Sequence, residues 1–290
     1  MSHIPGPECA DCLRRLALDT LDRCGLDGAA RARLQTQGEA ILAQGLEQAW
    51  PPAIIANRFL ALVRRYRPTK DPMAAKKAAD LAAARRAVRE LGPVPDTLEA
   101  RVRAAIIGNS LDHFLVARPE EFWGRGLDFG LGIDHLARAA SYLVPGAGIV
   151  ILADNTGEQC FDRLLVEHLL GRGCRVTYVV KSRPVQNDLT LEDLRAHGED
   201  YGLGRVVGSG TAQVGLDPEA IPGPLARRLQ QADLVVAKGM GHYETLRRTA
   251  GLDGGGPSPW PLLFLFLAKC RPVARSLGVE LGAAVAALAP

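Results

Sequence analysis

The stretch GIVILADNTGEQCFDRLLVEHLLGRGCRVTYVV, residues 148–180, decides the fold. Two short runs rich in Val and Ile flank a segment whose apolar residues recur at the spacing of an amphipathic helix. A strand, a helix and a second strand in this order are typical of parallel strands joined by a crossover helix. The stretch therefore predicts an α/β protein with a parallel sheet.

The same alternation continues toward the C-terminus. RVVG at 205–208 and DLVVA at 233–237 are further β-branched runs, and LTLEDLRAHGEDYG at 189–202 is a helical segment between strands. PLLFLFLA at 261–268 suits either a buried strand or a short helix. From residue 146 to residue 290 we therefore expect a mainly parallel sheet with helices on both faces.

Residues 1–145 have a different texture. Several long segments place apolar residues at helical intervals, with Arg, Lys and Glu on the other faces, and they are separated by Pro-rich breaks such as Pro51–Pro52 and RPTKDP at 67–72. We expect a helical N-terminal subdomain over 1–145, whose last helices pack on the sheet of the α/β domain at 146–290.

Composition excludes several classes of function. The chain has 290 residues, is 47% hydrophobic and carries a formal charge of +3, too little to indicate binding to nucleic acid or to an acidic membrane surface. We find no signal peptide and no apolar run of the roughly 18 residues that a membrane span needs. A cytoplasmic protein is expected.

Six cysteines are spread widely along the chain, which favours reduced thiols over a disulfide framework. Cys9 and Cys12 form a C-x-x-C pair near the N-terminus, with neither a second pair nor a nearby His. A structural role, a metal site and a redox role all stay open for this pair.

Polar or glycine-rich residues follow each of the four apolar runs. Because ligands bind at the carboxyl ends of parallel strands, these residues are expected to share one site. They are Asp154 and Asn155 after the first run, Asp188 after the second, Ser209 after the third, and Lys238, Gly239 and Gly241 after the fourth.

The residue types indicate metal-assisted phosphate chemistry. Asp154, Asn155 and Asp188 offer hard oxygen donors suited to Mg²⁺ or Mn²⁺ rather than to structural zinc. Lys238 is a point charge suited to a phosphate oxygen. Backbone N–H groups at Ser209, Gly239 and Gly241 could approach an anion.

Each element also has a simpler interpretation. Asp154 and Asn155 are common turn residues, Asp188 with Thr190 could cap a helix, and Lys238 could be a solvated loop lysine. Asn109 and Asp112 are spaced to share one face of a helix. They are either ordinary polar residues on the helix surface or part of the wall of the same pocket.

Taken together, these motifs resemble the damage-control phosphatase family, known as domain of unknown function 89, in its prokaryotic C-x-x-C branch. The resemblance covers nearly the whole chain, in the family's order. The matching stretches are CADC from 9, DPMAAKKAA from 71, IIGNSLDHF from 106, ILADNTGEQCFDRLL from 151, VVKSRPVQNDLTLEDL from 179, GSGTAQVG from 208, ADLVVAKGMGHYE from 232 and LFLFLAKCRPVARSLGV from 263.

The resemblance implies a metal-dependent phosphatase of small phosphorylated metabolites, such as damaged or surplus sugar phosphates. It implies a helical subdomain packed on a three-layer α/β/α domain. The implied metal ligands are Asp154, Asn155 and Asp188, with Lys238 in the phosphate-binding loop, and the G-N-x-x-D motif maps to Asn109 and Asp112.

Several points stay open. The attacking group is either a metal-activated water or Asp154 itself, Co²⁺ and Ni²⁺ are alternatives to Mg²⁺ and Mn²⁺, and a homo-oligomer is compatible with the sequence. A phospho-ligand sensor without catalysis is one rival function. A nucleotide-cofactor enzyme such as a methyltransferase is the other, although YLVPGAG at 142–148 lacks the G-x-G-x-x-G turn.

Overall fold

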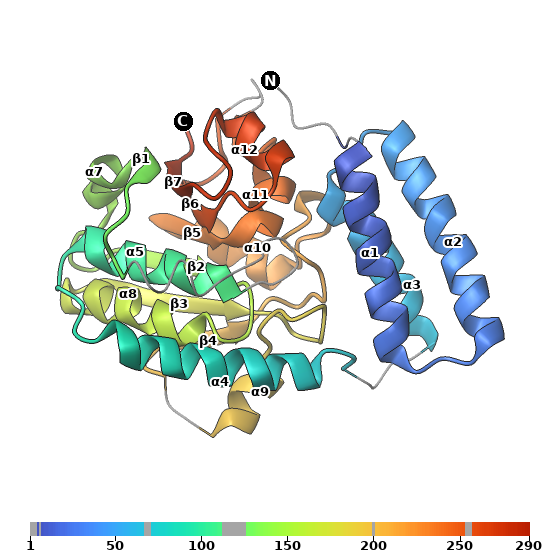
Figure 1. Cartoon of the computed structure of the whole chain (residues 1–290). Coiled ribbons are helices and arrows are strands. Elements are labelled where there is room, and N and C mark those ends of the chain that lie inside the picture. Colours follow the sequence, from blue (N-terminus) through green and yellow to red (C-terminus); the bar gives the residue numbers. More distant parts are fainter. Residues whose placement is uncertain (1–4, 6, 67–70, 112–125, 199–200, 253–256) are drawn as a thin grey trace.

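The computed structural model describes residues 5, 7–66, 71–111, 126–198, 201–252 and 257–290 (Figure 1). Its α-helices are α1 (Pro7–Cys24), α2 (Gly28–Glu47), α3 (Pro52–Tyr66), α4 (Ala74–Leu91), α5 (Leu98–Gly108), α7 (Leu136–Ala139), α8 (Gln159–Gly171), α9 (Leu191–His197), α10 (Gly223–Gln230), α11 (Gly239–Leu246) and α12 (Arg271–Leu277). Its strands are β1 (Leu131–Asp134), β2 (Gly148–Leu152), β3 (Arg175–Val180), β4 (Arg205–Gly208), β5 (Leu234–Lys238), β6 (Leu262–Leu267) and β7 (Ala284–Leu288).

The described residues form a seven-stranded sheet in the order β1-β7-β6-β5-β2-β3-β4. β4, β3, β2, β5 and β6 run parallel, while β7 is antiparallel to β6 and parallel to β1. The strand order reverses between β2 and β5, so that the loops after these two strands diverge at the same edge. Such a switch point is where open parallel sheets bind ligands.

Alternate residues of the strands enter two separate cores. In β2, Ile149 and Ile151 pack in the core that contains α5 and α8, whereas Val150 and Leu152 pack in the core that contains α10 and α11. Both faces are therefore covered, as continuous apolar strands require. The expected three-layer α/β/α architecture with a mainly parallel sheet is confirmed.

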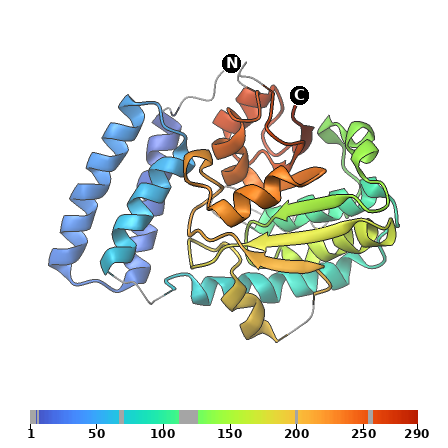
Figure 2. The same ribbon diagram turned by 180° about the vertical axis from the view of Figure 1, so that it is seen from behind.

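Helices α1, α2 and α3 form a bundle that stands beside the sheet (Figures 1 and 2). Leu21, Leu34 and Phe59, one from each helix, are buried in its core. Asp27 caps α2 by accepting a hydrogen bond from the backbone N–H of Ala30 at 2.8 Å. The amphipathic pattern of the N-terminal segment thus builds a compact unit with its own core.

Hydrogen bonds made by α3 help to tie this bundle to the α/β domain. The Ala53 N–H at the start of α3 donates to Glu244 Oε2 of α11 at 3.0 Å. Asn57 of α3 donates to the Val214 carbonyl at 3.0 Å and accepts from the Val214 N–H at 2.7 Å. Each of these α3 contacts has a main-chain group as one partner, whereas Glu8 of α1 accepts from the Arg275 side chain of α12 at 2.7 Å.

The sheet includes a strand upstream of residue 146. β1 lies at 131–134, and α4 and α5 already pack on the sheet core. The structural change from bundle to α/β layers therefore follows α3, well before the boundary at 145/146 that the texture of the sequence suggested. β1 is only four residues long and alternates between half-buried and exposed positions, so its sequence gives a weak strand signal.

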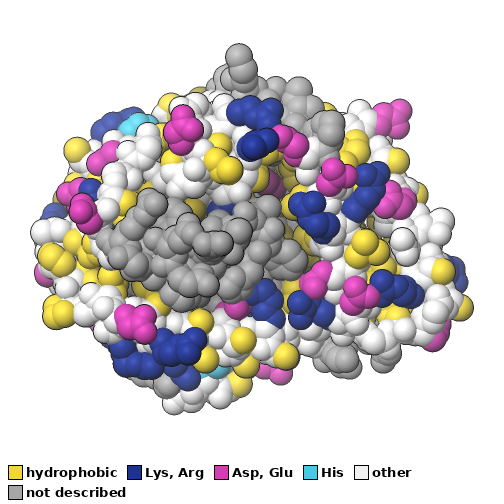
Figure 3. Space-filling model, viewed as in Figure 1, with side chains coloured by type: hydrophobic (Ala, Val, Ile, Leu, Met, Phe, Trp, Pro, Cys, Tyr) yellow, Lys and Arg dark blue, Asp and Glu magenta, His cyan; other side chains and the backbone are white. Residues whose placement is uncertain are grey.

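The surface in Figure 3 carries Lys and Arg interspersed with Asp and Glu over the bundle rather than a field of one sign. In the part of the chain that the structure describes, no helix is both long and apolar enough to cross a membrane.

Candidate active site

Backbone pairing brings the loops after β2 and β3 together. Asn155 and Asp188 form an isolated antiparallel bridge, the Leu189 N–H donates to the Asp154 carbonyl at 2.9 Å, and the Thr156 N–H donates to the Asn187 carbonyl at 2.8 Å. Asp154, Asn155 and Asp188 therefore sit side by side at the switch point. Their proximity is what the sequence predicted.

Thr190, not Asp188, caps the helix that follows. The Thr190 hydroxyl accepts from the Asp193 N–H at 3.0 Å, and the Asp193 carboxylate accepts from the Thr190 N–H at 2.9 Å. This capping box satisfies the start of α9. The side chain of Asp188 is therefore not used as a cap.

A cavity of about 350 Å³ lies between this sheet edge and the helical bundle. Asp154, Asn155, Asp188 and Gly241 line one side of it, together with Lys269. Residues of α1 and α3 line the opposite side. The three predicted oxygen donors thus face a space of the size that small-molecule ligands occupy.

The Asp154 carboxylate is held in one orientation by two amides. Asn109 Nδ2 donates to Asp154 Oδ2 at 3.1 Å and Asn155 Nδ2 donates to the same oxygen at 2.9 Å. Both amides also donate to Glu158 Oε1 at 2.9 Å. Among the described residues, Asp154 Oδ1 accepts no hydrogen bond, so this is the oxygen that is free to act on a ligand.

Gly239 is needed for this arrangement. It has a φ of +77°, a left-handed conformation that favours glycine, and a Cβ at this position would overlap the Asp154 carboxylate. The sequence predicted that Gly239 leaves room for an anion. In the structure that anion is the carboxylate of Asp154.

Lys238 lies beneath the site and is fully buried. Its Nζ is 2.6 Å from both Glu158 Oε2 and Asp162 Oδ1, and Tyr178 donates to the other Asp162 oxygen at 2.6 Å. It does not line the cavity. The sequence predicted that Lys238 would bind phosphate. In this structure its ammonium group instead pairs with the carboxylates of Glu158 and Asp162.

Negative charge accumulates around Asp154. Burial, followed by the charges of Glu158 and Asp188, raises the pKa of Asp154 well above its ordinary value. Burial alone would raise the pKa of Glu158 too, but the charges of Lys238 and Lys269 outweigh it and lower that pKa. A positive charge added beside Asp154 would therefore favour its ionised form.

A hard divalent cation fits this donor set. The described residues gather no group of three or more His, Cys, Asp or Glu side chains that could hold a metal, which leaves two carboxylates and one amide as donors. Because the Asn155 amide nitrogen faces the carboxylates, its oxygen is the end available to a cation. Oxygen donors of this kind suit Mg²⁺ and Mn²⁺.

Lys269 is a functional candidate that the sequence reasoning missed. It is buried, lines the cavity, and its charge acts to lower the pKa of both Asp154 and Glu158. It follows β6 almost directly, so the polar residue at the end of LLFLFLAK was the available signal. Because the run at 261–268 could be either a strand or a helix, Lys269 was not included in the predicted site.

The other predicted residues have different surroundings. Ser209 is buried and hydrogen-bonds the Thr211 hydroxyl at 3.0 Å, away from the residues that line the cavity. Gly241 lines the cavity. Asp112 lies outside the described residues. A phosphate contact at Ser209, Gly241 or Asp112 stays a prediction.

The C-x-x-C pair reaches the same cavity. Cys9 and Cys12 lie in the first turns of α1 and line the cavity together with Cys270, which precedes α12. None of these three described cysteines forms a disulfide. Nothing in the sequence connected this pair with Asp154, because only the docking of the bundle brings them to one space.

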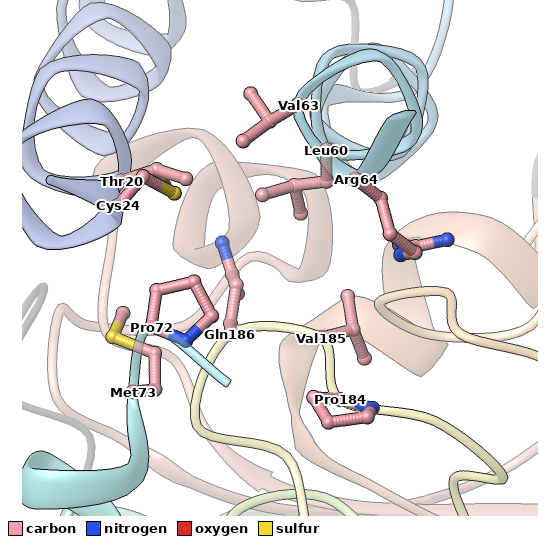
Figure 4. A pocket seen from close by; sticks show the side chains of 10 residues that line it. All are labelled: Thr20, Cys24, Leu60, Val63, Arg64, Pro72, Met73, Pro184, Val185 and Gln186. Carbon is pink, nitrogen blue, oxygen red and sulfur yellow. The ribbon is translucent and has the colours of Figure 1, made fainter. Parts of the chain in front are cut away.

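A second, smaller cavity of about 50 Å³ lies beside the first (Figure 4). Its lining includes Cys24, Val63 and Met73, and Gln186 borders both cavities. Gln186 has a φ of +45°, a strained conformation two residues before Asp188. The small cavity itself contains none of the predicted metal ligands.

Comparisons with known proteins identify the family of this chain. A sequence profile described as the damage-control phosphatase ARMT1-like domain matches residues 6–285. A damage-control phosphatase of Archaeoglobus fulgidus is 32% identical over 260 residues, covering 85% of each chain, and one of Pyrococcus horikoshii is 28% identical over 283 residues, covering 96% of each. The crystal structure of a DUF89 family protein from P. horikoshii matches with a TM-score of 0.84 at 27% identity, covering 99% of both chains. The chain therefore belongs to the damage-control phosphatase ARMT1-like family.

Proposed function

We propose that this chain is a metal-dependent phosphatase that hydrolyses small phosphorylated metabolites. The observation that carries the proposal is the pairing of the loops after β2 and β3, which gathers Asp154, Asn155 and Asp188 at the wall of a ligand-sized cavity. The names of two relatives, both damage-control phosphatases, support the same reaction class.

Asp154, Asn155 and Asp188 would hold the metal ion, with Mg²⁺ or Mn²⁺ preferred over Co²⁺ and Ni²⁺. When bound, the ion would neutralise charge on a phosphate and lower the pKa of bound water. Asn109 and Asn155 fix the Asp154 carboxylate, so that Oδ1 keeps a constant direction during turnover. An acid fixed in this way can act as a ligand or as a nucleophile.

We assign the phosphate-facing cation to Lys269 rather than to Lys238. Lys269 lines the cavity, whereas Lys238 neutralises the buried Glu158 and Asp162. A lysine at the cavity wall can bind a non-bridging phosphate oxygen and offset the charge that moves during transfer. Lys238 acts instead as a positioning residue. It pairs with Glu158, which accepts hydrogen bonds from the same two amides that orient Asp154.

The test is phosphate release from p-nitrophenyl phosphate by metal-stripped protein after each divalent metal is returned in turn. Wild-type protein is expected to release phosphate with Mg²⁺ or Mn²⁺, and Asp188→Asn is expected to release none above background. Arg172→Gln, a change directly after α8 at a residue that does not line the cavity, serves as a matched control.

Two outcomes would contradict the proposal. Release that needs no metal, or that persists in Asp188→Asn, would remove the metal site from the reaction. Metal binding by calorimetry without release from any phosphomonoester would instead favour a phospho-ligand sensor.

A further inference from the structure

Lys181 is a buried lysine to which the proposed reaction assigns no role. It follows β3 directly, its exposed fraction is 3%, and it does not line the cavity. Burial of an ammonium group is costly unless nearby acceptors compensate for the lost water. The partners of Lys181 therefore indicate what keeps a charge at this position.

Three acceptors from three segments surround the Lys181 ammonium. Its Nζ donates to the Gly215 carbonyl at 2.8 Å, and it lies 3.5 Å from both His242 Nε2 and Asp188 Oδ2. An ammonium has three N–H donors, so these acceptors match its full capacity. Lys181 is thus fixed between the loop after β4, helix α11 and the loop that carries Asp188.

His242 holds this ammonium without adding charge. His242 Nδ1 is 2.7 Å from the Lys238 carbonyl oxygen, which can only accept, so Nδ1 carries the ring proton. Nε2 is then the unprotonated nitrogen, and it faces Lys181 as an acceptor. Burial, followed by the charge of Lys181, lowers the pKa of His242 well below its ordinary value, in keeping with a neutral ring.

The main chain of Lys181 closes the loop that presents Asp188. The Lys181 N–H donates to the Leu189 carbonyl at 2.9 Å, and the Leu191 N–H donates to the Lys181 carbonyl at 3.3 Å. Residues 182–188 therefore form a loop with Lys181 at its base. The side chain of Lys181 turns back to Asp188, the last residue of this loop.

We infer that Lys181 is a positioning residue of the proposed metal site, and that its ammonium holds the Asp188 carboxylate in the direction in which it would bind the ion. The inference rests on the proposed function and adds to it a residue outside the cavity lining. Lys181 acts only through Asp188. Lys238 has the corresponding place behind Glu158, which shares two amides with Asp154.

Loss of the Lys181 side chain would have two opposite consequences for metal binding. A neutral residue would no longer repel a divalent ion, and this effect alone would strengthen binding. The Asp188 carboxylate would also lose the group that fixes its direction, and the loss of such a partner typically weakens metal binding about 10- to 100-fold. The sign of the change therefore distinguishes a positioning role from a role of charge alone.

Calorimetric titration of metal-stripped protein with Mn²⁺ measures this sign. Lys181→Met should bind Mn²⁺ at least about tenfold more weakly than wild type. Lys76→Met is the matched control, because Lys76 of α4 pairs with the buried Asp80 at 2.7 Å and does not line the cavity. The control should bind Mn²⁺ as wild type does, and unchanged or tighter binding by Lys181→Met would overturn the inference.

The electron paramagnetic resonance spectrum of bound Mn²⁺ gives a readout that a loss of stability alone does not change. At saturating Mn²⁺, Lys181→Met should alter the spectrum because Asp188 coordinates in a different direction, whereas Lys76→Met should keep the wild-type spectrum. An unaltered spectrum in Lys181→Met would contradict the positioning role. If Lys181→Met does not fold, Lys181→Gln, which keeps an N–H donor for Gly215, takes its place with the same expected signs.

This inference and the proposed function fail in different ways. Wild-type protein that bound no Mn²⁺ would overturn the proposed metal site and the role of Lys181 with it. Lys181→Met that bound Mn²⁺ and released phosphate as wild type does would overturn the role of Lys181 alone, and the phosphatase function would stand.

Discussion

The two sides of the cavity differ in almost every physical respect. The sheet edge holds charged and amide groups in fixed hydrogen bonds, with Glu158 and Asn109 supporting Asp154 from below. The bundle side presents aliphatic side chains and thiols beside the charged side chains of Glu8 and Arg15, and α3 is joined to the α/β domain by hydrogen bonds that involve main-chain groups. Under the proposed function, metal and phosphate would bind at the sheet edge, and the organic part of the substrate would contact the bundle side.

The largest expected effect follows from the sheet edge. Asp154→Asn should reduce phosphate release at least about a thousandfold, because both a metal ligand and its charge are lost. Without metal, the same variant should be more stable at neutral pH, because the raised pKa of Asp154 means that its charge opposes folding. Phosphate assays and urea unfolding at neutral pH measure both changes. Retained activity, or a large loss of stability, would remove Asp154 from its assigned role.

The two buried lysines allow a sharper comparison. Lys238→Met should lower the free energy of unfolding by about 3–5 kcal/mol, because Glu158 and Asp162 would stay buried without their cation. Lys269→Met should instead lower kcat/KM about a hundredfold with a smaller loss of stability. Urea unfolding and steady-state kinetics distinguish the two. If Lys238→Met were as stable as wild type and bound phosphate more weakly, Lys238 would be the phosphate-binding lysine that the sequence predicted.

A smaller effect is expected from the glycine beside Asp154. Gly239→Ala should weaken metal binding about 10- to 100-fold, because its Cβ would displace the Asp154 carboxylate. Gly210→Ala is the matched control, since Gly210 has a similar φ of +79° but meets Pro222 rather than a metal ligand. Calorimetric titration with Mn²⁺ gives both affinities. Equal losses in the two variants would mean that backbone strain, rather than the carboxylate, is responsible.

The smallest effect concerns the bundle side. The pKa of Glu244 is raised from 4.5 to about 7 in the folded protein, so its contribution to stability is fully present below pH 4.5 and is lost as the pH rises through about 7. Glu244→Gln keeps an acceptor for the Ala53 N–H and should abolish this loss of stability between pH 4.5 and about 7. Unfolding measured from pH 4.5 to 8 tests this. An unchanged slope in the variant would place the titration elsewhere.

Much of the sheet, and the proximity of Asp154, Asn155 and Asp188, could be predicted from the sequence. The runs at β2, β3, β4 and β5 are β-branched and short, and polar residues follow them directly, so the site at their ends is a local signal. β7 gives no such signal, because AVAAL is mostly alanine and becomes a strand only by pairing with β6.

Two other features had no such local signal in the sequence: the partners of Lys238, and the residues of α1 and α3 that line the cavity. Glu158 and Asp162 are one helical turn apart, and their distance from Lys238 along the chain is 80 and 76 residues. Only the packing of α8 against the sheet shows that they neutralise it. From the sequence, Leu16 is expected to pack inside the bundle. Only the position of α1 in the folded protein shows that it lines the same cavity as Asp154.

The contacts between the bundle and the α/β domain have an evolutionary consequence. The groups that Asn57 and Glu244 bind are main-chain atoms of Val214 and Ala53, which every amino acid except proline supplies in full. Substitutions at Val214 and Ala53 that preserve their packing can therefore leave these hydrogen bonds in place. A lineage could change the molecules that it accepts by successive substitutions on the bundle side, while the catalytic machinery is inherited intact.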